Sequence, residues 1–141
     1  MDLDSALQWA ADRRDGVLIT LRRDGRAQSS DITYLLDDGT FVVSVTADRA
    51  KTHNMGRDPR VVLHITDPPA WSYVSLDATA ELTPVAAAVD DPTVDQLVAY
   101  YRGVRGEEHP DWDDYRRAMV ADRRLVARIT PHAAVGNLRR R

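Results

Sequence analysis

Arg49 and Lys51 form the most informative chemical pair in this sequence. They lie two residues apart, after the apolar β-type run 41–46 and at the start of a short helical segment that stops near Gly56. A guanidinium, an ammonium and the free N–H groups of a helix N-terminus can all bind one anionic group. The spacing therefore predicts a phosphate site at a strand-to-helix turn. An Arg-x-Lys pair alone is more often two solvated charges, so the flanking sequence decides.

The flanking sequence supports the phosphate site. Asp58-Pro59-Arg60 follows the short helical segment and leads into the next β-type run. This order of strand, Arg-x-Lys, short helix and Asp-Pro-Arg resembles the phosphate-binding segment of the split β-barrel flavin and deazaflavin proteins, the pyridoxamine 5′-phosphate oxidase-like superfamily. The resemblance implies that Arg49 and Lys51 hold a cofactor phosphate, with Thr46 and Asn54 as hydrogen-bond partners.

An aromatic segment, Trp71-Ser72-Tyr73, follows a Pro-Pro turn and is expected to begin a strand. Side chains alternate along a strand, so Trp71 and Tyr73 are predicted to share a face. Such a pair could pack against a planar ring system of a ligand. The two side chains could equally lie in the core or in a dimer contact. With the Ala-x-Leu stretch that follows, the segment resembles the branch that binds the deazaflavin coenzyme F420, the actinobacterial flavin/deazaflavin oxidoreductases of class B. In that branch this segment crosses the dimer interface and contacts the cofactor of the partner subunit.

Other segments resemble the same branch along nearly the whole chain. Gln28 and Ser30, after the turn at Gly25, match positions that lie beside the deazaflavin ring. The late helical stretches 97–102 and 111–119, and the run 122–124 before the last strand, also match. Two features depart from the pattern: the link Ala47-Asp48 before Arg49 is short, and Ala78 stands where relatives carry glycine.

The hydrophobic and turn patterns predict a mainly β (α+β) fold. Strands are expected over 17–21, 27–36, 41–46, 60–66, 71–82 and 124–129, and helices over 5–14, 91–105 and 112–121, with a short helix after Arg49. Asp24-Gly25 and Asp38-Gly39 are typical of tight turns, and Asp111 is expected to cap the helix that follows it. Hairpin-linked strands, late helices and a returning strand predict an antiparallel split β-barrel with peripheral helices, one domain over residues 1–141. The resemblance also implies that the protein is a homodimer.

Composition narrows the class of protein. The chain has 141 residues, 43% hydrophobic and 29% charged, which is typical of a globular domain. A net charge of −3 argues against nucleic-acid binding, and Arg139–Arg141 is only a short basic tail. The chain contains no cysteine, and its four histidines lack metal-ligand spacing, so no metal site is expected. The sequence contains no long apolar run, which argues against a membrane span, and its N-terminus is acidic, which argues against a signal peptide. Both features predict a cytoplasmic protein.

The resemblance implies an F420-dependent oxidoreductase that transfers a hydride between C5 of the deazaflavin and a small electron-poor organic substrate. Its pocket would be lined by Gln28 and Ser30 and closed by Trp71, Ser72 and Tyr73 of the partner subunit. Two alternatives stay open: an FMN-dependent enzyme of the same superfamily, and a non-catalytic F420 carrier. The sequence marks no catalytic acid or base, and Tyr73 and solvent are the candidate proton donors.

Overall fold

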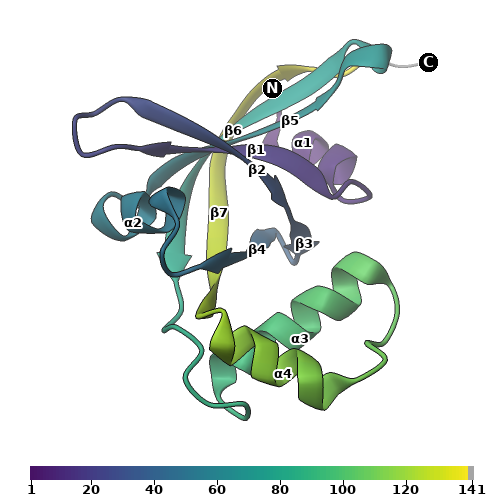
Figure 1. The fold of residues 1–141 in the computed structure, drawn as a ribbon. Helices are drawn as coiled ribbons and strands as arrows, with labels where there is room; N and C mark the ends of the chain where they lie inside the picture. Colours follow the sequence, from purple (N-terminus) through teal and green to yellow (C-terminus); the bar gives the residue numbers. More distant parts are fainter. Residues whose placement is uncertain (140–141) are drawn as a thin grey trace.

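A computed structural model describes residues 1–139 of the chain, which form one antiparallel seven-stranded sheet and its helices. The sheet curls into a half-barrel, as predicted, with the strand order β2-β1-β5-β6-β7-β4-β3 (Figure 1). The strands are β1 (Asp15–Leu21), β2 (Ala27–Thr33), β3 (Leu35–Asp37), β4 (Thr40–Thr46), β5 (Arg60–Asp67), β6 (Ser72–Leu82) and β7 (Arg124–Asn137). The helices are α1 (Leu3–Ala10), α2 (Ala50–Arg57), α3 (Pro92–Arg105) and α4 (Trp112–Ala121), with a 3₁₀ turn η1 (Pro68–Ala70) between β5 and β6.

The last strand is longer than the sequence predicts. The predicted strand stops at Ile129, before Pro131, but β7 continues to Asn137 along β6. Pro131 lies opposite Ala78, where the pairing register between β6 and β7 shifts. A residue without an N–H group is tolerated at such an irregularity because no ladder hydrogen bond has to be made there.

Two other predicted elements also differ in their bounds. Helix α1 ends at Ala10, not Arg14, and is capped by Asp2, whose carboxylate accepts from the Ser5 N–H at 3.0 Å. The predicted strand 27–36 is interrupted between β2 and β3 at Tyr34, which is fully buried and donates its hydroxyl to the carbonyl of Ala10 at 2.8 Å. The interruption lets the chain pass from β2 at one edge of the sheet to β3 at the other edge. The hydrogen bond of Tyr34 holds the end of α1 against the sheet.

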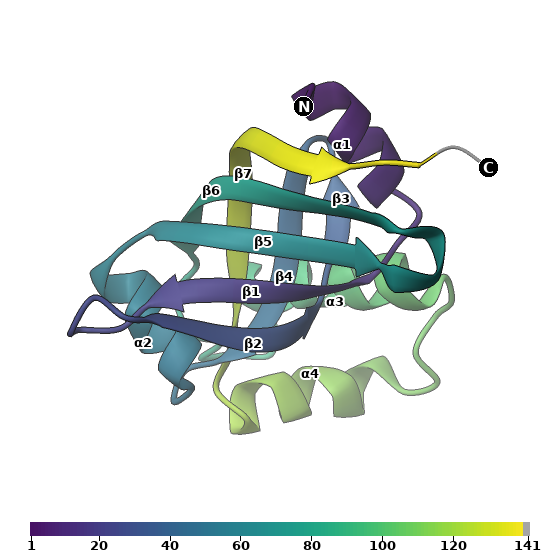
Figure 2. The same cartoon turned by 90° about the horizontal axis from the view of Figure 1, so that it is seen from above.

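Two apolar clusters hold the fold together. The first fills the half-barrel and includes Leu18, Phe41, Leu63 and Leu76, all fully buried. The second joins α3 and α4 to β4 and β7, and its buried members are Val42, Ala86, Val94, Leu97, Val98, Tyr115 and Val126. Burying each large side chain contributes about 1.5–3 kcal/mol, so the second cluster fixes the helical hairpin firmly beside β4. Figure 2 shows α3 and α4 together on one side of the sheet.

Aspartate side chains cap the two late helices. Asp91 accepts from the Val94 N–H at 2.8 Å at the start of α3. Asp111 accepts from the Asp114 N–H at 3.1 Å, which confirms its predicted capping role. Across residues 1–139, no helix is long and apolar enough to span a membrane. The basic tail 139–141 lies mostly outside the described residues.

Candidate functional site

The turn between β4 and α2 has the geometry of an anion site. The Thr52 hydroxyl donates to the Thr46 carbonyl at 2.7 Å, which fixes the start of α2 against the end of β4. Arg49 is the N-cap residue, yet its exposed side chain makes no capping hydrogen bond, and the first turn of α2 contains no acidic residue. The positive end of the helix is therefore not neutralised by its own side chains.

Lys51 extends from this turn into a pocket of about 400 Å³. Burial lowers the pKa of the half-buried Lys51, and the nearby Arg49 and Arg124 guanidinium groups lower it further, while Asp31 acts in the opposite direction. The cations thus repel one another in the free protein. An anion bound beside Lys51 would relieve that repulsion.

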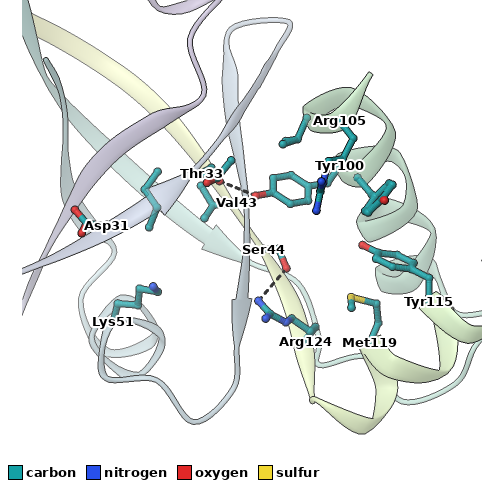
Figure 3. Close-up of a pocket in the computed structure, with 13 residues that line it drawn as sticks. Asp31, Thr33, Val43, Ser44, Lys51, Tyr100, Arg105, Tyr115, Met119 and Arg124 are labelled. Atoms are coloured by element: carbon teal, nitrogen blue, oxygen red, sulfur yellow. Dashed lines mark hydrogen bonds between the residues drawn. The ribbon is translucent and has the colours of Figure 1, made fainter. Parts of the chain in front are cut away.

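The pocket lies between the sheet and the α3–α4 hairpin (Figure 3). Its lining comes from β2, β4, α2, α3, α4 and β7, and consists of Asp31, Ile32, Thr33, Val43, Ser44, Lys51, Tyr100, Tyr101, Val104, Arg105, Tyr115, Met119 and Arg124. Three of these side chains are cationic and one is acidic, so the pocket favours an anionic ligand.

The two tyrosines in the pocket wall are engaged in the fold. The Tyr100 hydroxyl donates to the Thr33 carbonyl at 2.7 Å, across the gap between α3 and the end of β2 (Figure 3). The Tyr115 hydroxyl donates to the Leu97 carbonyl at 2.9 Å, and burial raises the pKa of Tyr115 to about 12. Burial also raises the pKa of Tyr100. Both phenols therefore stay protonated and act as structural donors.

Arg124 is the pocket residue that sequence reasoning missed. It opens β7 and pairs with Thr46 at the end of β4, which places it beside the predicted phosphate turn. Its Nη1 approaches the Ser44 hydroxyl only at 3.4 Å, and its buried Nε finds no partner among the described residues. The sequence shows only one arginine among several near the last strand. Only the pairing of β4 with β7 reveals that Arg124 belongs to the site, because it brings the start of β7 to the end of β4.

Asn54 on α2 is hydrogen-bonded to Gln28 on β2, the strand that also contains Ser30. Asn54 is buried and donates to the Thr20 hydroxyl at 3.1 Å and to Gln28 Oε1 at 3.5 Å, while its own Oδ1 accepts from Arg57 at 2.8 Å. Gln28 and the half-buried Ser30 are two residues apart on β2. None of the three lines the Lys51 pocket, and their contacts with a cofactor stay predictions.

The aromatic segment lies at the other end of the sheet. Strand β5 runs from the end of α2 to η1, and its eight residues span about 26 Å at 3.3 Å per residue. Figures 1 and 2 show α2 and the β5–β6 turn at opposite ends of the sheet. Trp71 and Tyr73 therefore cannot close the Lys51 pocket of their own chain.

The local geometry of the segment corrects one prediction. Trp71 does not begin the strand: it ends η1 in the left-handed region, with φ 52°, so the alternation rule does not apply to it. Trp71 is 77% exposed and Tyr73 is 41% exposed, so neither is a core residue of this chain. Ser72 is buried and fixes the turn, because its hydroxyl donates to the Ala70 carbonyl and accepts from the Arg139 N–H.

A curled antiparallel half-barrel with a cation-lined pocket at a strand-to-helix turn defines a split-barrel protein of the flavin-binding class. The pyridoxamine 5′-phosphate oxidase family model matches residues 4–134, and the chain belongs to this family. The fold is similar to a conserved hypothetical protein of Mycobacterium tuberculosis, with a TM-score of 0.76 and 21% identity over 98% of this chain and 85% of that one.

Two further solved structures share the fold. One is an F420 reductase, with a TM-score of 0.68 and 23% identity over 92% of this chain and 94% of that one. The other is an FAD-binding protein of Mesorhizobium loti, with a TM-score of 0.67 and 16% identity over 96% of this chain and 92% of that one. At these identities the likeness establishes the fold.

Proposed function

We propose that the protein is an F420-dependent oxidoreductase of the class B branch of its family, acting as a cytoplasmic homodimer. The observation that carries the proposal is the half-buried Lys51, held beside Arg49 at the N-terminus of a helix without acidic residues in its first turn. Such a site fits the phosphate of a flavin or deazaflavin cofactor. The similar F420 reductase supports the choice of deazaflavin.

The residues of the chain would bind and orient the cofactor. Lys51, Arg49 and the first N–H groups of α2 would hold the phosphate, with Thr46 at the end of β4 beside them. Gln28 and Ser30 would lie along the ring, and Asn54 would hold Gln28 in place. The bound deazaflavin would supply the hydride chemistry, and the pocket residues would fix its distance to the acceptor.

In the proposed dimer, the partner subunit would provide the aromatic residues that contact the deazaflavin ring. Trp71, Tyr73 and Val135 are large apolar side chains exposed at one end of β6 and β7. Covering them against a second copy would remove apolar surface from water and could bring the partner's Trp71 and Tyr73 to the cofactor. The buried Ser72 would hold that segment in shape.

An FMN-dependent enzyme is the second candidate. FMN carries a phosphate that Arg49 and Lys51 would also bind, and one similar structure is an FAD-binding protein. A third possibility is an F420 carrier without turnover, because the residues that bind the cofactor are the same in a carrier and an enzyme.

Titration of the purified apo-protein with F420 and with FMN, followed by fluorescence, tests the proposal. We expect F420 to bind at least tenfold more tightly than FMN. Oxidation of bound reduced F420 by a panel of electron-poor acceptors then distinguishes an enzyme from a carrier. Preferential FMN binding would favour the second candidate, and tight F420 binding without oxidation by any acceptor would favour the carrier.

A further inference from the structure

The Lys51 pocket continues past the phosphate turn. Lys51 lies on its α2 side, whereas Arg105 and Arg124 line it from α3 and β7. In Figure 3 the side chains of Lys51 and Arg124 are directed toward one another, and Arg105 lies at the far end on α3. The residues expected beside the ring, Gln28 and Ser30, are not part of this pocket. The pocket therefore offers room for a ligand group other than the ring.

Arg124 is incompletely bonded within the protein. Its Nε is buried without a partner, its bond to Ser44 is long at 3.4 Å, and no described carboxylate forms an ion pair with it. Native proteins rarely leave a buried guanidinium donor unpaired, because the lost hydration is not compensated. A ligand oxygen in the pocket would supply the missing acceptor.

We propose that Arg124, with Ser44 beside it and Arg105 at the rim, forms a second anion subsite that is separate from the phosphate turn at Arg49 and Lys51. The planar guanidinium fork suits a carboxylate or phosphate bound through two oxygens. The Ser44 hydroxyl can donate to the same group. The Arg105 side chain is exposed, with its guanidinium 5.5 Å from the Tyr101 ring centre, and can reach an anion that enters from solvent.

Two sources could provide this anionic group. F420 carries a chain of glutamates beyond its phosphate, whereas the side chain of FMN ends at its phosphate. If the ligand is F420, an assignment that rests on the proposed function, its glutamate carboxylates would enter the subsite. The other source is a free acidic molecule that binds beside the cofactor.

The first experiment compares two forms of F420, one with its glutamates and one ending at the phosphate. For the wild-type protein we expect the form with glutamates to bind about tenfold or more tightly. Arg124→Met should weaken that form by about ten- to a hundredfold and leave the truncated form within about twofold. Arg128→Met is the matched control, because it removes the same charge from the same strand outside the pocket, and should change neither affinity.

Arg105→Gln keeps the test decisive if Arg124→Met folds poorly, because Arg105 is exposed. It should weaken only the form with glutamates, by a few-fold, and more strongly at low salt. The second experiment uses citrate as a free polycarboxylate probe and follows binding by calorimetry. Citrate binding that Arg124→Met abolishes, together with equal affinity for the two F420 forms, would support the subsite with a free acid as its source.

The subsite is overturned if the two F420 forms bind equally and citrate binding does not depend on Arg124. If no form of F420 binds, the proposed function fails, and the citrate experiment alone still decides whether the subsite exists.

Discussion

Replacing Lys51 by methionine tests the phosphate turn most directly. The change keeps the apolar stem that packs in the pocket and removes the ammonium. A charge-assisted hydrogen bond to an anion contributes about 1.5–3 kcal/mol, which corresponds to a loss of about ten- to a hundredfold in F420 affinity. Lys51 is half-buried and should lie toward the upper end of this range, whereas the exposed Arg49 should contribute about tenfold or less and depend more on salt.

The pH dependence gives a second signature of Lys51. Its pKa is lowered from 10.5 in the free protein, and a bound anion would raise it again. F420 affinity should therefore fall as the pH rises toward 10.5 and Lys51 loses its proton, and this fall should be absent from Lys51→Met. Fluorescence titration between neutral and alkaline pH measures both effects.

The stability of the apo-protein should change in the opposite direction. Because the folded pKa of Lys51 lies below the unfolded value, the unfolded chain binds more protons between the two values, and the contribution of Lys51 to stability rises with pH in that window. At neutral pH the charged Lys51 destabilises the folded state. Lys51→Met should therefore melt at the same or a higher temperature than wild type while binding F420 more weakly.

Arg23→Met is the matched control, since it makes the same charge change at an exposed turn. If Lys51→Met binds F420 as tightly as this control does across the pH range, Lys51 does not contact the phosphate. If Lys51→Met loses stability together with affinity, the weaker binding reflects damage to the fold.

Three further outcomes are expected. The protein should sediment at twice its chain mass at micromolar concentration, and Trp71→Asp should shift it toward the monomer; a wild-type monomer that binds F420 would exclude the shared pocket. Tyr73→Ala should slow the single-turnover oxidation of reduced F420, measured at saturating F420, by about a hundredfold and should affect F420 affinity less. An unchanged rate would show that Tyr73 does not pack against the ring. Gly136→Ala should destabilise the protein by about 1–3 kcal/mol in urea unfolding, because a Cβ there would clash with the backbone carbonyl oxygen of Tyr73. Gly56→Ala, where the nearest atom is 3.9 Å away, is the control and should be neutral or slightly stabilising.

The sequence predicts the architecture well because local signals dominate it. The Asp-Gly turns, with positive φ at Gly25 and Gly39, separate the first strands as expected. The length of β7 could not be predicted in the same way. Pro131 is a local signal for termination, and only the register shift opposite it in β6 makes it compatible with a strand.

The candidate site is predictable only in part, for a similar reason. Arg49 and Lys51 are neighbours in sequence, so their spacing reveals them. Arg124 joins Lys51 from more than 70 positions along the chain, through the pairing of β4 with β7. The sequence predicts that Trp71 begins the strand because it follows a Pro-Pro turn, but the left-handed conformation of Trp71 at the end of that turn depends on the three-dimensional path of the chain.

The position of β7 has a consequence for synthesis of the protein. Among the described strands, β7 is the last to leave the ribosome, yet it is an inner strand of the sheet, between β6 and β4. Until it emerges, the facing edges of β4 and β6 have no strand to pair with, and the half-barrel cannot close. Open strand edges readily pair with other chains. A nascent chain should therefore depend on chaperones until β7 is released, and premature termination anywhere before Arg124 should yield aggregated rather than partly folded product.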